Sequence, residues 1–227
     1  MTVAVYRGSE RFSTSEPGRN TRHSFSFGAH YDPANLGFGP MLCHNDDVLG
    51  PGHGYGEHPH RDLEIVTWVI SGALVHTDTQ GHHRVLRPGE VQVVSAGSGI
   101  RHSEVGDPGS GPTRFIQVWL TPDEFGASPR YRTEEAGDLT EGLVRVVGGD
   151  GLDIGRRGAS LWVGRLKPGQ EVSLPRAGRQ HVFAATGSLT VEGVHIGPGD
   201  AVRLDGAGGS RTVASTPSEL LVWSFDS

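Results

Sequence analysis

The chain has 227 residues, of which 35% are hydrophobic and 20% are charged, and it carries a formal net charge of −6 with a pI near 6.0. This length fits one large β domain or two domains of about 100 residues each. The acidic balance and the lack of a basic stripe argue against direct nucleic-acid binding.

Membrane and secretory features are not evident in the sequence. No run reaches the ~18 apolar residues of a transmembrane helix, and the first residues, MTVAVYRGSERFSTSEPGRN, show no apolar h-region followed by a cleavage site. The single cysteine, Cys43, excludes an intrachain disulfide framework and is expected to be a small buried hydrophobe. We therefore expect a cytoplasmic protein without a membrane partner.

Strand-like segments follow one another along the chain. The 35 glycines and 14 prolines separate short runs rich in β-branched and aromatic residues, at a spacing of about 8 to 12 residues. Helical periodicity is nearly absent. These features predict an all-β sandwich or barrel. The clearest expected strands are residues 63–70, 73–77, 91–95, 114–120, 160–166, 188–194 and 219–225.

The second half of the chain repeats the pattern of the first. Gly72 matches Gly187, and the Pro-Gly-acid turn at 88–90 matches the one at 198–200, with strands and turns in the same order around them. A repeat of this length indicates a duplicated domain. The polar, turn-rich segment 121–142 is the expected linker, so we expect an N-terminal domain over residues 1–133 and a C-terminal domain over residues 134–227.

Four side chains of the first half have the spacing of a metal site. Residues i and i+2 of a strand project to the same side, so His58 and His60 face together, and so do His102 and Glu104. The two pairs are about 40 residues apart and would supply three imidazoles and one carboxylate. This donor set suits a divalent first-row metal, and four protein ligands leave two positions open on a six-coordinate ion.

The same residues also have a simpler interpretation. Among 12 histidines in 227 residues, His58 and His60 could be surface residues and Glu104 a solvated strand residue. The H-x-E that follows the H-x-H, with a β-meander and a Pro-Gly turn between them, favours the metal site. No ligand role is expected for the remaining histidines: His23, His30, His44, His53, His76, His181 and His195, and the turn residues His82 and His83, which are expected at the surface.

These motifs are similar to those of a known family. Residues 52–72 follow the first cupin motif, with Glu64 after the H-x-H and a closing glycine. Residues 88–102 resemble the second motif, with SAG at 95–97 in place of the usual Pro-x-Gly. The segments HPHRDLE, GSGIRHSE and FSFGAHYDP resemble the pirin family, most closely its bacterial quercetinase-like members, and the resemblance covers nearly the full length.

The resemblance implies a bicupin, two tandem β-barrels of the jelly-roll type. It implies that His58, His60, His102 and Glu104 bind the metal in the N-terminal barrel, and that Glu64 has a structural or ligand-orienting role. The expected cofactor is one divalent transition metal ion, Fe²⁺ first, with Ni²⁺, Cu²⁺, Co²⁺, Mn²⁺ or Zn²⁺ as alternatives.

The second half departs from this ligand pattern. Aligned on the matching glycines and turns, Ser173 and Pro175 fall opposite the H-x-H pair, and Thr212 and Ala214 fall opposite the H-x-E pair. None of these side chains can replace an imidazole. We therefore expect a degenerate, metal-free C-terminal barrel.

The resemblance also implies a function. Quercetin 2,3-dioxygenase-like relatives open the heterocyclic ring of a flavonol with dioxygen and release carbon monoxide, so a small enolic aromatic and dioxygen are the expected substrates. A bound metal would acidify the enol hydroxyl, and Glu104 would accept its proton as the catalytic base. An aromatic wall for the substrate could come from Trp68, Phe25, Phe27 or Phe38, although core packing is the alternative for each.

Two other functions remain open at this point. Pirins of animals are regarded as iron-dependent co-regulators, which implies a metal- or redox-sensing binding protein with a protein partner and without essential turnover. The cupin fold also hosts isomerases and hydrolases that use the same metal as a Lewis acid.

Overall fold

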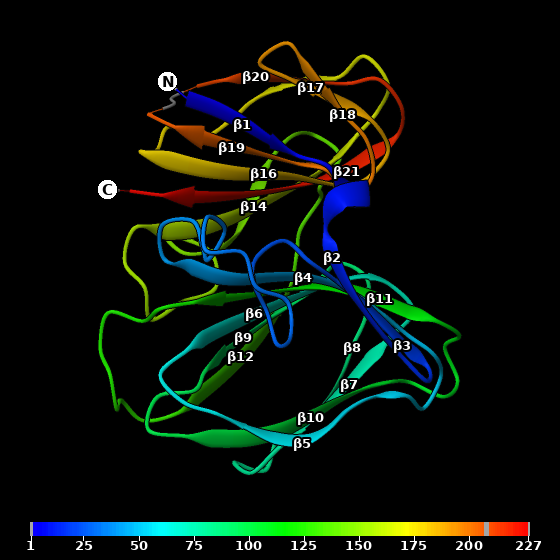
Figure 1. The fold of residues 1–227 in the computed structure, drawn as a ribbon, viewed down its shortest axis with the longest axis vertical. Coiled ribbons are helices and arrows are strands. Elements are labelled where there is room, and N and C mark those ends of the chain that lie inside the picture. Colours follow the sequence, from blue (N-terminus) through cyan, green and yellow to red (C-terminus); the bar gives the residue numbers. More distant parts are fainter. Residues whose placement is uncertain (1, 207–208, 227) are drawn as a thin grey trace. The chain divides into compact units, whose positions relative to one another are not determined.

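The computed structural model describes residues 2–206 and 209–226, and strands dominate it. Among these residues the helical structure is one short 3-10 turn, η1 (Gly8–Glu10), so the all-β prediction is confirmed. The chain forms two compact units, each built from two antiparallel sheets (Figure 1). Within the described ranges, no helix has the length and apolar character needed to span a bilayer.

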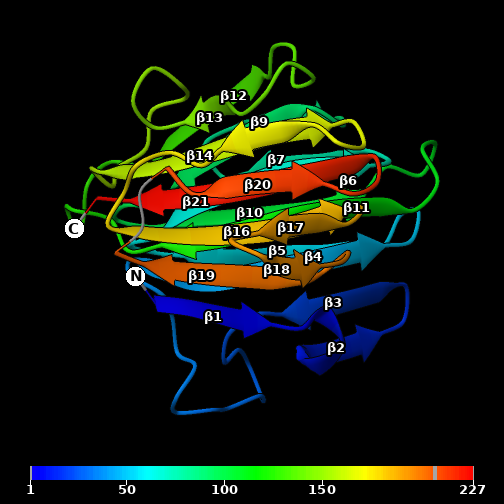
Figure 2. The ribbon, with the colours of Figure 1, turned by 90° about the horizontal axis from the view of Figure 1, so that it is seen from above.

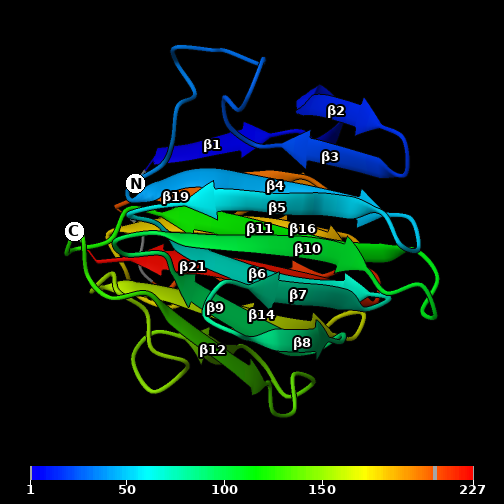
Figure 3. The ribbon, with the colours of Figure 1, turned by 90° about the horizontal axis from the view of Figure 1, so that it is seen from below.

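The N-terminal unit consists of Phe12–Glu135 together with Ile154–Arg156. Its larger sheet has the strand order β12-β9-β6-β11-β4-β3-β2, and its smaller sheet has the order β5-β10-β7-β8, whose strands lie side by side in Figure 3. The strands are β2 (Phe12–Glu16), β3 (Arg19–His23), β4 (Met41–Leu49), β5 (Gly54–His60), β6 (Glu64–Ser71), β7 (Leu74–Asp78), β8 (His83–Leu86), β9 (Glu90–Ser95), β10 (Ile100–Gly106), β11 (Thr113–Leu120) and β12 (Arg130–Glu135).

The C-terminal unit contains the described residues up to Arg11, Ala136–Asp153 and the described residues from Arg157 onward. Its larger sheet has the order β1-β19-β16-β21-β14-β13, and its smaller sheet has the order β15-β20-β17-β18 (Figure 2). The strands are β1 (Thr2–Tyr6), β13 (Val144–Val147), β14 (Ala159–Leu166), β15 (Glu171–Ser173), β16 (Arg179–Thr186), β17 (Leu189–Val191), β18 (Val194–Ile196), β19 (Ala201–Asp205), β20 (Arg211–Ala214) and β21 (Ser218–Phe225).

The compact units differ from the expected division into 1–133 and 134–227 at the start of the chain. β1 pairs antiparallel with β19 and covers one edge of the larger C-terminal sheet, so the first strand belongs to the C-terminal unit. An unpaired edge strand exposes backbone donors and acceptors, which gives a physical reason for this pairing.

Two details of the structure differ from the sequence prediction. The expected linker 121–142 contains β12, which pairs with β9 at the edge of the larger N-terminal sheet. The expected strand 188–194 is a hairpin of β17 and β18, because Glu192 and Gly193 both have positive φ and form a tight turn.

The structure supports the internal repeat at the level of single contacts. Gly72 and Gly187 have φ values of 74° and 70°, and a Cβ at either position would lie within 2.7 Å of the backbone around Pro112 or Pro217. The acid of each Pro-Gly-acid turn accepts a backbone N–H from three residues earlier, Glu90 from Arg87 and Asp200 from Gly197. The two halves therefore share the same turn chemistry.

Each unit has an apolar interior. Among the described residues, buried apolar side chains of the N-terminal unit cluster around Phe115 and around Ile65, and those of the C-terminal unit include a cluster around Val182 and Val222. Buried polar residues of the N-terminal unit include Thr67, Gln92 and Gln117.

Candidate metal centre

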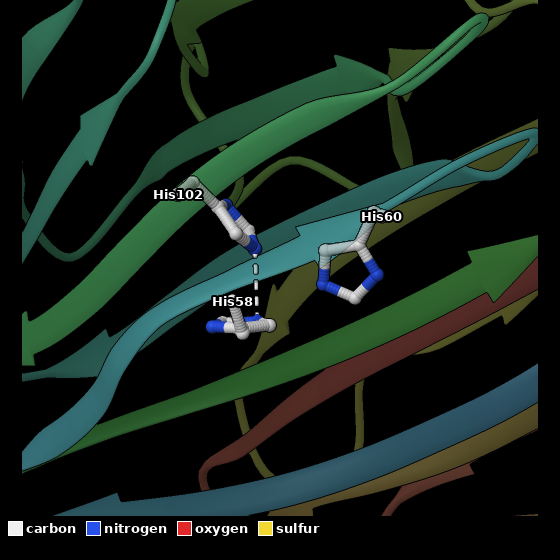
Figure 4. A group of neighbouring side chains, drawn as sticks. All are labelled: His58, His60 and His102. Atoms are coloured by element: carbon white, nitrogen blue, oxygen red, sulfur yellow. Dashed lines mark hydrogen bonds between the residues drawn. The ribbon is translucent and has the colours of Figure 1, made fainter.

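Three of the four predicted ligands lie together between two paired strands. β5 and β10 run antiparallel, with His102 opposite His58 and Ile100 opposite His60. The ring centroids are 4.6 Å apart for His58 and His102, 4.8 Å for His58 and His60, and 4.9 Å for His60 and His102. Figure 4 shows the three rings turned toward one another, two from β5 and one from β10.

The nitrogen atoms of this group fit a shared cation. The His58 Nδ1–H donates to the carbonyl of Gly56 at 2.8 Å, so Nε2 carries the free lone pair. That Nε2 lies 3.1 Å from Nε2 of His102. Two nitrogen ligands at right angles around a metal, each at about 2.1 Å, would be about 3.0 Å apart. Nε2 of His60 is buried, and no described residue offers it a hydrogen bond.

The surroundings favour the neutral, metal-binding form of the imidazoles. Burial, together with the neighbouring His102 and His58 rings, lowers the pKa of His60 to about 4. Burial also lowers the pKa of His102, although the Glu104 carboxylate acts in the opposite direction. At neutral pH these rings therefore have lone pairs available for a cation.

Glu104 is buried, like His102 and His60. It is 1% exposed, and its register position on β10 faces Tyr55 of β5 after a bulge that follows His102. The ligand atoms of His58, His60 and His102 all lie within 4.8 Å of one another, and Glu104 forms a second such group with His102 and His76. The fourth predicted ligand, Glu104, is therefore grouped with His102 and also with His76, which was not a predicted ligand.

A row of polar side chains on the larger sheet holds the Glu104 carboxylate. Gln92, Thr67 and Gln117 are in register across β9, β6 and β11. The amide of Gln92 donates to Glu104 Oε1 at 3.2 Å, and the amide of Gln117 donates to Oε2 at 2.6 Å. Both amides also lie within hydrogen-bond distance of the Thr67 hydroxyl. A buried carboxylate without such donors would be strongly destabilising.

Trp119 connects this polar row to the histidines. Its indole N–H donates to Gln117 Oε1 at 2.9 Å, which directs the amide nitrogen of Gln117 toward Glu104. The indole ring also makes an edge contact with His60, with centroids 4.9 Å apart. Sequence reasoning missed Gln92, Gln117 and Trp119, because their roles depend on which strands become neighbours.

These contacts keep Glu104 charged. Burial alone raises the pKa of Glu104, but the imidazoles of His102 and His76 and the hydrogen bond from Gln117 outweigh it, so the pKa lies below its usual value. The carboxylate is thus available as a cation ligand or as a proton acceptor. Each oxygen accepts one amide hydrogen bond and keeps a further lone pair.

The C-terminal unit has no such row at the equivalent positions. The repeat places Val202, Val182 and Val222 where Gln92, Thr67 and Gln117 lie, and the three valines are in register across β19, β16 and β21. All three belong to the apolar cluster of that unit. A carboxylate at this depth would therefore lack its amide donors.

The pairing of β15 with β20 corrects the alignment of the second half by one residue. Val172 lies opposite Thr212, as His58 lies opposite His102, and the N–H of Leu174 bonds to Ser210. The positions equivalent to His58 and His60 are thus Val172 and Leu174, not Ser173 and Pro175. Both are buried and apolar, and Thr212 and Ala214 occupy the other two positions as expected.

The remaining predicted residues lie outside the histidine cluster. Glu64 accepts hydrogen bonds from the Ser95 hydroxyl at 2.7 Å and from the Gly155 N–H at 3.0 Å, and neither candidate ligand group of the described residues includes it. This agrees with a structural role. Cys43 is buried, as expected.

The candidate aromatic residues lie in different surroundings. Phe25 and Trp68 are fully buried in the core. Phe27 makes an edge contact with Trp119, and Phe38 is half-buried. Phe27 is thus joined to the cluster through the indole that touches His60.

An open pocket gives access to this region of the N-terminal unit. Its volume is about 460 Å³, within the range of small-molecule sites. Of the predicted metal ligands, His60 forms part of the wall. The other lining residues are Pro59, Arg61, Thr79, Gly99, Ile100 and Arg101.

The fold and the site define a bicupin with a histidine and glutamate cluster in the N-terminal domain that could bind a metal. The pirin family model matches residues 5–120, and the model for the quercetinase C-terminal cupin domain matches residues 149–225. The chain belongs to the pirin family, and its two units are the paired cupin domains of that family.

Curated relatives and solved structures match over nearly the whole chain. A Mycobacterium tuberculosis protein named "Putative quercetin 2,3-dioxygenase Rv0181c" is 44% identical over 98% of this chain and 94% of its own length. Quercetin 2,3-dioxygenase of Escherichia coli is 31% identical over 97% of each chain. The crystal structure of the bacterial pirin YhhW from Escherichia coli in complex with nickel(II) superposes with a TM-score of 0.91, at 29% identity and 99% coverage of both chains.

Proposed function

We propose that this protein is a metal-dependent oxygenase that cleaves a flavonol or a similar enolic aromatic with dioxygen, in the manner of quercetin 2,3-dioxygenase. His58, His60, His102 and Glu104 would hold one divalent transition metal ion. The observation that carries the proposal is the grouping of His58, His60 and His102, together with the buried, amide-held Glu104 that lies near His102. The names of the quercetin 2,3-dioxygenase relatives support the same reaction class.

The protein side chains would divide the work between them. When bound, the metal supplies Lewis acidity that lowers the pKa of an enolic hydroxyl. Glu104, charged and held by Gln92 and Gln117, would accept the proton released from the substrate. The open pocket beside His60 would admit a flat substrate. Phe27 and Trp119 would supply an aromatic edge.

The donor set defines a class of metal ions and does not single out one of them. Imidazole and carboxylate donors accept Fe²⁺, Ni²⁺, Co²⁺, Cu²⁺, Mn²⁺ and Zn²⁺. Fe²⁺ is the ion we propose first, and nickel is the ion that the related crystal structure contains. Reconstituting metal-free protein with each ion and measuring oxygen uptake will rank them.

Oxygen uptake with quercetin tests the reaction. Metal-loaded wild-type protein should consume oxygen as the quercetin absorbance falls, and His60→Ala should abolish this activity because the cluster loses one imidazole. His195→Ala removes an exposed imidazole from the C-terminal unit and should leave the rate unchanged. Wild-type protein that is fully loaded with metal but leaves quercetin intact would exclude this substrate.

The alternative function predicts a different behaviour of the metal-loaded protein. A metal- or redox-sensing binding protein would hold the metal without turnover, and its affinity for a protein partner would change with the oxidation state of the metal. Identical captured partners from oxidised and reduced protein would count against this alternative.

A further inference from the structure

His76 is a buried imidazole that the proposed mechanism does not use. It lies on β7 directly opposite Glu104 of β10, and Asp78 lies opposite His102 in the same register. The ring is fully buried and makes an edge contact with the His102 ring, with centroids 5.2 Å apart. Its position therefore adds a fourth imidazole on the inner side of the cluster.

The hydrogen bonds of His76 are those of an oriented metal ligand. Its Nε2 lies 3.2 Å from Oδ2 of Asp78, and the same carboxylate accepts backbone N–H groups from Gln80 and His82. With Asp78 held in this way, the Nε2–H donates and Nδ1 keeps the lone pair. Nδ1 is buried, and nothing in the described part of the chain gives it a hydrogen bond. Carboxylate–histidine pairs of this kind commonly orient metal-binding imidazoles.

The donor atoms around His76 are close enough to share an ion. One atom each from His76, His102 and Glu104 lie within 4.8 Å of one another, and all three residues are buried. Opposite ligands of a metal with bonds of about 2.1 Å are about 4.2 Å apart, so small side-chain movements would close the group. An unsatisfied buried nitrogen is destabilising, and a bound cation would relieve that cost.

We propose that His76, His102 and Glu104 form a second, inner position for a divalent transition metal ion. This position shares His102 and Glu104 with the outer one, which His58 and His60 complete. The inference rests on the metal-binding part of the proposed function, but it does not depend on which substrate is turned over. It predicts that the protein retains a metal ion, with lower affinity, when the outer imidazoles are removed.

Titration of metal-free protein with Co²⁺ tests the inner position. The double variant His58→Ala/His60→Ala should still bind about one Co²⁺ per chain, with a visible absorption spectrum different from that of wild type. Adding His76→Gln should weaken this residual binding about tenfold or more. Adding His83→Gln instead, an exposed imidazole of β8, should leave it unchanged.

Two outcomes would overturn the inference. The double variant could bind no Co²⁺ while its circular dichroism remains that of wild type, or the residual binding could be unaffected by His76→Gln. Zinc-loaded wild-type protein labelled with ¹⁵N-histidine provides a readout that needs no variant. Partial occupancy of the inner position should shift the His76 Nδ1 resonance toward the ligated range, and an unchanged resonance would also refute the proposal. Oxygen uptake by wild type reports on the proposed reaction separately.

Discussion

Asp47 should make the metal-free protein less stable as the pH rises, and Asp47→Asn should remove that dependence. The carboxyl of Asp47 is 1% exposed. Its Oδ1 accepts hydrogen bonds from the Thr21 hydroxyl at 2.5 Å and the Tyr55 hydroxyl at 2.6 Å. Burial, reinforced by Glu104 and Asp46, raises the pKa of Asp47 from 3.8 to about 7 despite these two hydrogen bonds.

The sign of the effect follows from proton linkage. Between pH 3.8 and about 7 the folded protein keeps a proton on Asp47 that the unfolded chain has released. The contribution to stability is therefore fully present below the unfolded pKa, and it is lost as the pH rises through the folded pKa. Between pH 5 and pH 8 this pKa difference corresponds to a loss of about 3 kcal/mol in the free energy of unfolding.

Urea unfolding of metal-free protein at pH 5 and pH 8 measures this loss. Asp47→Asn keeps an amide oxygen as acceptor for both hydroxyls but cannot ionise, so its unfolding free energy should fall by about 3 kcal/mol less than that of wild type. The control Asp205→Asn removes an exposed carboxylate, which pairs with Arg179 in the C-terminal unit. It should keep the wild-type pH dependence. Equal pH dependence in wild type and Asp47→Asn would refute the reasoning.

Two further substitutions test the different roles of Glu104, a predicted metal ligand, and Glu64, a structural carboxylate. Gln117→Leu removes the 2.6 Å hydrogen bond to Glu104 and should lower metal affinity about 10- to 100-fold, as measured by Co²⁺ titration; unchanged affinity would show that the amide does not position the carboxylate. Glu64→Ala leaves the Ser95 hydroxyl and the Gly155 N–H without their acceptor. It should lower the free energy of unfolding by about 1–3 kcal/mol in urea and leave metal affinity within about twofold; a large loss of metal would instead make Glu64 part of the site.

Much of the candidate site could be predicted from the local spacing of residues in the sequence. The side chains of His58 and His60, and of His102 and Glu104, share a face because alternation along a strand is a local property. Gly72 and Gly187 were matched correctly for a similar reason. Each turn has a positive φ and no room for a Cβ, so both copies of the repeat require a glycine there.

Residues that depend on strand pairing were not visible in the sequence. Gln92 and Gln117 support Glu104 only because β9, β6 and β11 are neighbours in register. His76 has the same i, i+2 spacing with Asp78 as the recognised pairs, so its H-x-D pattern was a signal that could have been read. The sequence does not show that β7 pairs with β10, so it could not place His76 beside Glu104.

The second half shows the opposite failure. The alignment used Gly187 as its fixed point. Between Gly187 and the three-residue strand β15 lie the irregular residues 174–178, and across them the alignment was wrong by one residue. Such a shift changes which side chains face inward. The Val202–Val182–Val222 row gives a clearer contrast with the polar row of the N-terminal unit, and it was accessible from the repeat.

Metal analysis of freshly purified protein tests the central claim most directly, with wild type and His102→Ala compared side by side. His102 belongs to both candidate ligand groups, so its loss should reduce bound metal from about one ion per chain to less than about a tenth of that, while circular dichroism shows the fold intact. Undiminished metal in His102→Ala would contradict the ligand assignment and, with it, the proposed chemistry.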